Sequence, residues 1–199
     1  MTTRVGINGF GRMGRLTLRA LWEQPVDIVQ VNDPAGDAAM LAHLLNYDSV
    51  HGKWSHRAVA EGAEIVVGKS RIAVSSNESI ADTDWSACDR VIEASGQFRK
   101  SAVLKDYLEQ GVGRVVVTAP VKEEGVLDVV MGVNQHLFDP ARHRSVSAAS
   151  CTTNSLAPVV KVIHENRGIR HGCMTTIHDF TNTQTILDAP HKDPRRARA

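Results

Sequence analysis

Apolar residues along the chain follow two alternating patterns, one typical of strands and one of helices. Short apolar runs predict strands at 4–9, 26–33, 89–96, 113–120, 127–134 and 144–149. Apolar residues at helical spacing predict helices at 12–24, 36–49 and 101–111. The segment 63–76 predicts a hairpin that turns at Gly68 and Lys69. Runs such as "VVV" and "VIEA" are apolar on both faces, which indicates a mostly parallel sheet covered by helices, an α/β fold.

The pattern changes near Cys151. A long helix is predicted at 151–166 and a strand at 172–179, followed by a polar stretch. We therefore predict one domain at 1–150 and the start of a second at 151–199.

Composition narrows the classes of function. The chain is 42% hydrophobic and 23% charged, with a net charge of +1, which argues against nucleic acid or an anionic membrane as a partner. The basic tail "HKDPRRARA" lacks the interleaved aromatic residues of a nucleic-acid site. No apolar run is long enough to cross a bilayer, and the N-terminus does not resemble a signal peptide. Three cysteines without a C-x-x-C pair indicate a reduced, cytoplasmic protein without a thiolate metal site.

A glycine-rich loop lies between the first predicted strand and helix. It has the G-x-G-x-x-G spacing of a dinucleotide site, formed by Gly9, Phe10, Gly11, Arg12, Met13 and Gly14. Asp33 ends the next strand, where a carboxylate accepts hydrogen bonds from a ribose and repels a 2′-phosphate. The sequence therefore predicts a Rossmann-type, doubly wound sheet that binds NAD rather than NADP. The alternative is a plain glycine turn.

A second phosphate-loop candidate is "VGKS" at 67–70. The glycine that such a loop needs at position 63 is Ala63, and no helix follows. A hairpin turn is the better interpretation.

The candidate nucleophile is Cys151, at the start of the helix predicted at 151–166. Free amide groups at a helix start favour the thiolate form of a cysteine. His178 ends the strand predicted at 172–179 and could exchange a proton with the thiol. The alternatives are a buried structural thiol and a core histidine, and spacing alone does not decide. Cys88 and Cys173 are predicted to be structural.

Five segments resemble phosphorylating glyceraldehyde-3-phosphate dehydrogenase across the whole chain: "GINGFGRMGR", "VND", "YDSVHG", "ASCTTN" and "HDFTNTQTILDAPHKD". This resemblance implies that residues 151–199 begin an α+β catalytic domain. It also implies that Cys151 attacks the aldehyde to give a thiohemiacetal, that His178 is the base, and that a thioester is cleaved by inorganic phosphate to an acyl phosphate.

The resemblance extends to the binding residues. Ser150 and Thr152 match the site of the attacking phosphate, and Thr181 and Thr183 match that of the substrate phosphate. Arg12 and Met13 match backbone donors to the pyrophosphate. The remaining matches lie on the adenosine side or line the cofactor cleft: Asn32, Asp33, Ser95, Gly96 and Thr118.

The family's catalytic domain continues well beyond the position that matches Ala199. The expectation is therefore a truncated chain that binds NAD weakly and has little activity alone, with a homotetramer expected for a full-length member. Alternatives are an erythrose-4-phosphate dehydrogenase, a non-catalytic NAD-binding fragment, or the arsenic-resistance branch, in which arsenate replaces phosphate. The segment "TIHDFTNTQTILDAPHKD" favours the last.

Overall fold

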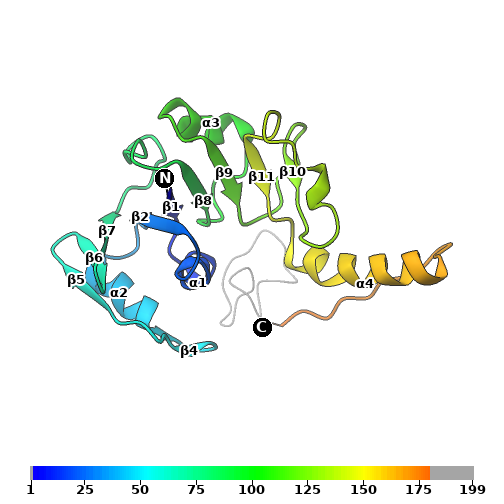
Figure 1. Ribbon diagram of the computed structural model, residues 1–199, viewed down its shortest axis with the longest axis horizontal. Coiled ribbons are helices and arrows are strands. Elements are labelled where there is room, and N and C mark those ends of the chain that lie inside the picture. Colours follow the sequence, from blue (N-terminus) through cyan, green and yellow to red (C-terminus); the bar gives the residue numbers. More distant parts are fainter. Residues whose placement is uncertain (1, 180–199) are drawn as a thin grey trace, which may run out of the picture. The chain divides into compact units, whose positions relative to one another are not determined.

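A computed structural model describes residues 2–179. Its main sheet has nine strands in the order β10-β11-β9-β8-β1-β2-β7-β6-β5 (Figure 1). In chain order they are β1 (Thr3–Asn8), β2 (Val26–Asn32), β5 (Ala58–Glu61), β6 (Glu64–Val67), β7 (Ser70–Ser75), β8 (Arg90–Glu93), β9 (Arg114–Val117), β10 (Leu127–Asp128) and β11 (Ser145–Ser147). The helices are α1 (Arg12–Leu21), α2 (Ala38–Asn46), α3 (Ser101–Glu109) and α4 (Cys151–Arg167), with a 3-10 turn η1 (Gln135–Leu137). A separate two-stranded sheet pairs β3 (Tyr47–Asp48) with β4 (Gly52–Lys53).

The main sheet is parallel from β10 to β7 and antiparallel from β7 to β5. This confirms the predicted α/β fold with a mostly parallel sheet. Val67 pairs with Ser70, so Gly68 and Lys69 form the predicted hairpin turn, and Gly68 has the positive φ of 61° that such turns favour. The phosphate-loop alternative at 67–70 is thereby excluded.

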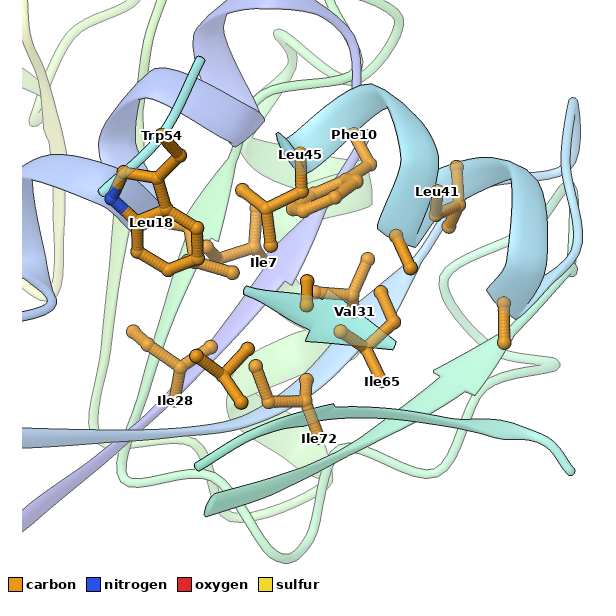
Figure 2. Close-up of a cluster of buried hydrophobic side chains, with 14 of the residues drawn as sticks. Ile7, Phe10, Leu18, Ile28, Val31, Leu41, Leu45, Trp54, Ile65 and Ile72 are labelled. Atoms are coloured by element: carbon orange, nitrogen blue, oxygen red, sulfur yellow. The ribbon is translucent and has the colours of Figure 1, made fainter. Parts of the chain in front are cut away.

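Helices cover both faces of the sheet. One core cluster contains Ile7 and Val31 from the strands with Leu18 from α1 and Leu45 from α2 (Figure 2). The other contains Val91 and Val115 from the strands with Leu104 and Tyr107 from α3. Burying one such aliphatic side chain contributes about 1.5–3 kcal/mol. The sheet is therefore doubly wound, as expected from sequence runs that are apolar on both faces.

Neighbouring residues of β1 point to opposite faces. Ile7 lies in the first cluster, whereas a Cβ on Gly6 would lie 2.7 Å from the Cys88 sulfur and 2.9 Å from the Trp85 ring, both in the second cluster. Glycine at this position lets the Trp85 ring pack close to the backbone of the strand.

Two predicted strands differ from the structure, and three short strands were not predicted. The strand predicted at 172–179 is wrong: these residues have no regular structure, because no described strand pairs with them. The strand predicted at 127–134 is reduced to β10, since a turn follows Asp128. The strand β5 and the small β3–β4 sheet were not predicted, because each depends on strand pairing that runs of two to four residues do not reveal.

The chain divides into two units after Lys161, within α4. The predicted domain boundary at Cys151 lies at the start of the same helix and stays a prediction. No residue of α4 is buried, and its exposed apolar side chains include Val159 and Ile163. Within residues 2–179, no helix combines the length and apolar character needed to span a membrane.

Candidate functional site

The glycine loop joins β1 to α1, and each glycine meets a different requirement. Gly9 has a φ of 87°, and a Cβ there would collide with the backbone of Ala94 and Ser95. A Cβ on Gly14 would collide with the carbonyl oxygen of Gly9. Gly11, the N-cap of α1, has no atom within 4 Å of its Cβ position.

The open space at Gly11 is suited to an anion. No side chain caps α1, and its first turn holds no acidic residue, so its first amide groups are available as donors. Arg12 and Met13 occupy this first turn, and Met13 is half exposed. These residues fit the pyrophosphate of a dinucleotide, as their sequence pattern predicts.

The loop is anchored from both sides. Phe10, a predicted cofactor residue, has its ring in the first core cluster at 1% exposure (Figure 2). The Phe10 amide donates to the Asp33 carboxylate at 2.6 Å, and the Ala35 amide donates to the same carboxylate at 2.9 Å. Asp33 is half-buried at the end of β2 and therefore both holds the loop and presents a negative charge beside it.

The predicted residues on the neighbouring strands lie at the same edge of the sheet. Ser95 and Gly96 follow β8, and Thr118 follows β9, both of which run parallel to β1. Gly96 has a φ of 74°, and the Thr118 amide donates to the Glu93 carbonyl at 2.9 Å. The structure thus brings the predicted residues at the ends of β1, β2, β8 and β9 to one edge, as expected for a cofactor cleft.

A buried polar network underlies this edge, and the sequence reasoning missed most of it. Glu93 and Asn8 are 1% and 2% exposed, and the Asn8 amide nitrogen donates to Glu93 at 2.9 Å. Tyr107 donates its hydroxyl to the same Glu93 oxygen at 2.6 Å. Burial, with the adjacent carboxylate, raises the pKa of Tyr107 and keeps it a donor. The acid within the apolar run "VIEA" was the available signal.

Asn32 belongs to this network. It is 2% exposed, donates to Asn8 and the Asn77 carbonyl, and accepts from Ser75 and the Asn77 amide. Its amide group is therefore fully used within the protein, and direct contact with adenosine stays a prediction.

Cys151 is exposed and is the first residue of α4, which confirms the predicted helix start. The two preceding residues shape this start. Ala149 is buried at a φ of 57°, a conformation that costs a non-glycine residue about 1 kcal/mol or more. The Ser150 hydroxyl accepts from the Thr153 amide at 3.0 Å, so it caps the helix. The Asn154 side chain donates to the Ala148 carbonyl at 2.7 Å and holds the turn from the other side.

A hollow of about 550 Å³ lies beside this helix start. Its lining includes Lys122, Asn134, Ala149, Ser150 and Thr153. Ser150 is half-buried and borders the hollow, whereas Thr152, the other residue predicted to bind the attacking phosphate, is half-buried on the first turn of α4.

The other predicted site residues follow α4 in the chain. His178 is exposed in the irregular segment after α4, in the second unit, so its pairing with Cys151 stays a prediction. Thr181 and Thr183 lie outside the described residues, as does most of the segment that favours the arsenic branch.

The remaining cysteines differ from each other. Cys88 is 2% exposed, and burial raises the pKa of its thiol to about 11, which confirms a structural thiol. Cys173 is exposed, so the prediction that it is structural is wrong. The prediction relied on a strand that the structure does not contain.

Comparison with known proteins identifies the family. The model of the glyceraldehyde 3-phosphate dehydrogenase NAD binding domain matches residues 3–101, and that of the C-terminal domain matches residues 150–199. The whole chain is 54% identical to glyceraldehyde-3-phosphate dehydrogenase 3 of Nostoc sp.. It is 48% identical to glyceraldehyde-3-phosphate dehydrogenase 1 of Bacillus subtilis and 48% identical to the enzyme of Geobacillus stearothermophilus.

The chain spans about 60% of the length of each of these relatives. The two family models follow each other along it in the order dinucleotide domain, then C-terminal domain. The glycine loop and the ends of β1, β2 and β8 fall within the first model, whereas β9 and Thr118 lie beyond its last matched residue. Together, these matches show that the chain belongs to the glyceraldehyde-3-phosphate dehydrogenase family and carries its NAD-binding domain.

Proposed function

We propose that Cys151 is the nucleophile in the NAD-dependent oxidation of glyceraldehyde 3-phosphate to an acyl phosphate. The observation that carries the proposal is an exposed thiol at the first position of a 17-residue helix, in a chain with this family's dinucleotide domain. A helix start favours the negative charge of a thiolate, and the thiolate is the attacking form.

The reaction proceeds in two stages. The Cys151 sulfur attacks the aldehyde carbon, and protonation of the carbonyl oxygen gives a thiohemiacetal. Loss of a proton, with His178 as base, and of a hydride leaves a thioester on Cys151. When bound, NAD accepts the hydride. An oxygen of inorganic phosphate then attacks the thioester carbon, the carbon–sulfur bond breaks, and the acyl phosphate leaves with the thiolate restored.

The chain's own groups have distinct tasks in this proposal. The first turn of α1, at Gly11, receives the pyrophosphate, and Asp33 receives the adenosine ribose. Ser150 and Thr152 hold the attacking phosphate, and Thr181 and Thr183 hold the phosphate of the substrate. Hydroxyl groups suit both sites because they donate to phosphate oxygens without adding charge.

The proposal also covers the acyl acceptor, the substrate and the assembly. Arsenate has the same shape and charge as phosphate and is the alternative acyl acceptor, and erythrose 4-phosphate is the alternative substrate. The proposed full-length assembly is a homotetramer. Substrate choice is tested by comparing the two aldehydes in acylation of Cys151, and acceptor choice by comparing phosphate with arsenate in release of the acyl group.

The decisive experiment uses the thiol chemistry of the chain itself, with Cys173 as an internal control. Both thiols are exposed, but only Cys151 begins a helix. The protein is treated with limiting iodoacetamide at pH 7, and the alkylated positions are quantified by mass spectrometry. We expect Cys151 to react at least about tenfold faster than Cys173, because the amide dipoles at a helix start stabilise negative charge on an attacking sulfur. Equal rates would refute the assignment of Cys151 as an activated nucleophile.

A second measurement tests acylation directly. Incubation with glyceraldehyde 3-phosphate and NAD should add an acyl group to Cys151, and phosphate should remove it. The Cys151→Ser variant should show no adduct. An adduct of the same yield in that variant would place the chemistry elsewhere.

A further inference from the structure

Glu93 is a buried carboxylate that is balanced by hydrogen-bond donors alone. It is 1% exposed, and within residues 2–179 no ion pair involves it. One of its oxygens accepts from the Ser95 amide at 2.8 Å and from the Ser95 hydroxyl. The other accepts from Asn8 at 2.9 Å and from Tyr107 at 2.6 Å. Burying a carboxylate is costly unless donors surround it, so these four donors hold it in place.

A carboxylate can only accept hydrogen bonds, and this fixes the direction of its neighbours. Asn8 must turn its nitrogen toward Glu93, which leaves its oxygen to accept from the Asn32 nitrogen at 2.8 Å. The Asn32 oxygen then faces away from Asn8. It accepts from the Ser75 hydroxyl at 2.9 Å and from the Asn77 amide at 2.9 Å. Glu93 and the Tyr107 hydroxyl thus orient the Asn8 amide, and Asn8 together with the Asn77 backbone orients the Asn32 amide.

This relay, Glu93–Asn8–Asn32–Asn77, runs across the edge that carries the cofactor residues. Glu93, Asn8 and Asn32 end β8, β1 and β2, which are neighbours in the sheet, and Asn77 follows β7, the next strand. Residues predicted to bind NAD follow three of these strand ends: Gly9 and Asp33 come directly after β1 and β2, and Ser95 comes two positions after Glu93. A change in the orientation of one amide would therefore displace several binding loops at once.

We propose that Glu93 is a positioning residue for the cofactor, which acts by setting the direction of the Glu93–Asn8–Asn32–Asn77 relay. It holds the Ser95 loop directly and the loops after β1, β2 and β7 through Asn8 and Asn32. The proposal rests on the assignment of this edge as the NAD site, and its test includes a measurement that does not involve NAD.

The first variant is Glu93→Gln, which keeps the size of the side chain. If the new amide keeps its oxygen toward Ser95, its nitrogen faces the Asn8 nitrogen, and two donors oppose each other. If Asn8 turns over, the conflict passes to Asn32. We expect NAD affinity to fall by about tenfold or more, and exchange of the Asn77 amide with deuterium to accelerate by a similar factor, because one buried donor is left unpaired.

The second variant, E93Q combined with N8D, tests the direction of the relay. The acceptor-only group then stands at position 8. It accepts from the new amide at position 93 and, with its other oxygen, from Asn32, while the oxygen at position 93 still accepts from Ser95. Every donor has an acceptor again, and the total charge equals that of the unmodified protein. We expect the double variant to recover most of the Asn77 protection and the NAD affinity, although N8D alone places two carboxylates together and destabilises the protein.

Two control variants separate the effect of the relay's direction from the effects of altered packing and altered charge. Tyr107→Phe removes the hydroxyl that donates to Glu93 and accepts from Asn8 at 2.6 Å, but it leaves the Glu93 carboxylate as an acceptor for Asn8, so Asn77 exchange should stay near the unmodified rate. Glu109→Gln makes the same change of charge at an exposed position of α3 and should alter neither measurement. Melting temperatures are recorded for all variants, and exchange is compared only where the folded state predominates.

The outcomes are distinct. Rescue of Asn77 exchange in the double variant supports the relay, whether or not NAD binds. An Asn77 amide that exchanges at the unmodified rate in E93Q, or a double variant no better protected than E93Q, overturns it. If the unmodified 199-residue chain fails to bind NAD while the exchange pattern follows the relay, the assignment of the cofactor site fails and the relay stands as a structural device.

Discussion

Gly14→Ala provides a sharp test of the glycine loop, because two known effects oppose each other. Gly14 lies inside α1, where alanine is favoured over glycine by about 1 kcal/mol. However, its Cβ would collide with the Gly9 carbonyl oxygen and lie 3.3 Å from the Ile7 side chain. The Gly9 oxygen belongs to the backbone and cannot rotate away, so α1 must move from β1. Overpacking of this kind costs about 1–3 kcal/mol.

The contact is with rigid backbone, which places the overpacking cost at the upper end of that range. After the gain in helix propensity is subtracted, the free energy of unfolding should fall by about 2 kcal/mol. For a chain of this size, the loss corresponds to a melting temperature lower by about 4–8 °C. Thermal unfolding followed by circular dichroism gives the melting temperature, and urea unfolding gives the free energy. A variant as stable as the unmodified protein, or more stable, would refute the close approach of α1 to β1.

Gly11→Ala is the matched control from the same loop. Its Cβ position has no atom within 4 Å, and its φ of −65° suits alanine. The cost to stability should be within about 1 kcal/mol, the usual effect of a poorer N-cap. Because the added methyl group occupies the space proposed for the pyrophosphate, NAD affinity should fall by about tenfold or more. The two variants thus separate packing of the loop from its ligand.

Three further predictions concern single groups. Asp33→Asn removes the charge and keeps only one of the two oxygens that accept from the Phe10 and Ala35 amides, so stability should fall by about 1 kcal/mol. The preference for NAD over NADP should fall by about tenfold, measured by calorimetry with both cofactors, and an unchanged preference would exclude Asp33 as the discriminating charge. In a disulfide-exchange assay at pH 8, Cys151 and Cys173 should react in the native protein and Cys88 only on unfolding, and rapid reaction of Cys88 would contradict its burial. Burial raises the pKa of Cys88 from 9.0 to about 11, so the stabilisation that comes from keeping this thiol protonated is complete below pH 9 and is lost as the pH rises toward 11. In Cys88→Ala, the free energy of unfolding measured with urea should therefore decline less steeply between pH 9 and 11. An identical decline in the variant would exclude this contribution.

Local sequence patterns determined much of this protein. The alternation of apolar strands and amphipathic helices predicted the parallel sheet, because strands that are apolar on both faces must be covered by helices on both sides. The spacing of Gly9, Gly11 and Gly14 predicted the loop between β1 and α1, and small polar residues before the apolar run predicted the start of α4 at Cys151. These features depend on residues close together in the chain. The prediction of a strand at 172–179 was wrong because a strand needs a partner elsewhere in the chain, which local periodicity does not reveal.

Only the tertiary structure decided how the strand ends are held together. Asn8 and Glu93 are 85 positions apart, and Asn32 and Asn77 are 45 apart, so no local pattern joins them. The sequence predicted that Asp33 and Phe10 contact the cofactor. The structure shows that the carboxylate also anchors the loop and that the ring lies in the core. Hydrogen bonds between buried side chains form only after the sheet has placed their strands side by side, so the direction of the Glu93 relay is a property of the fold.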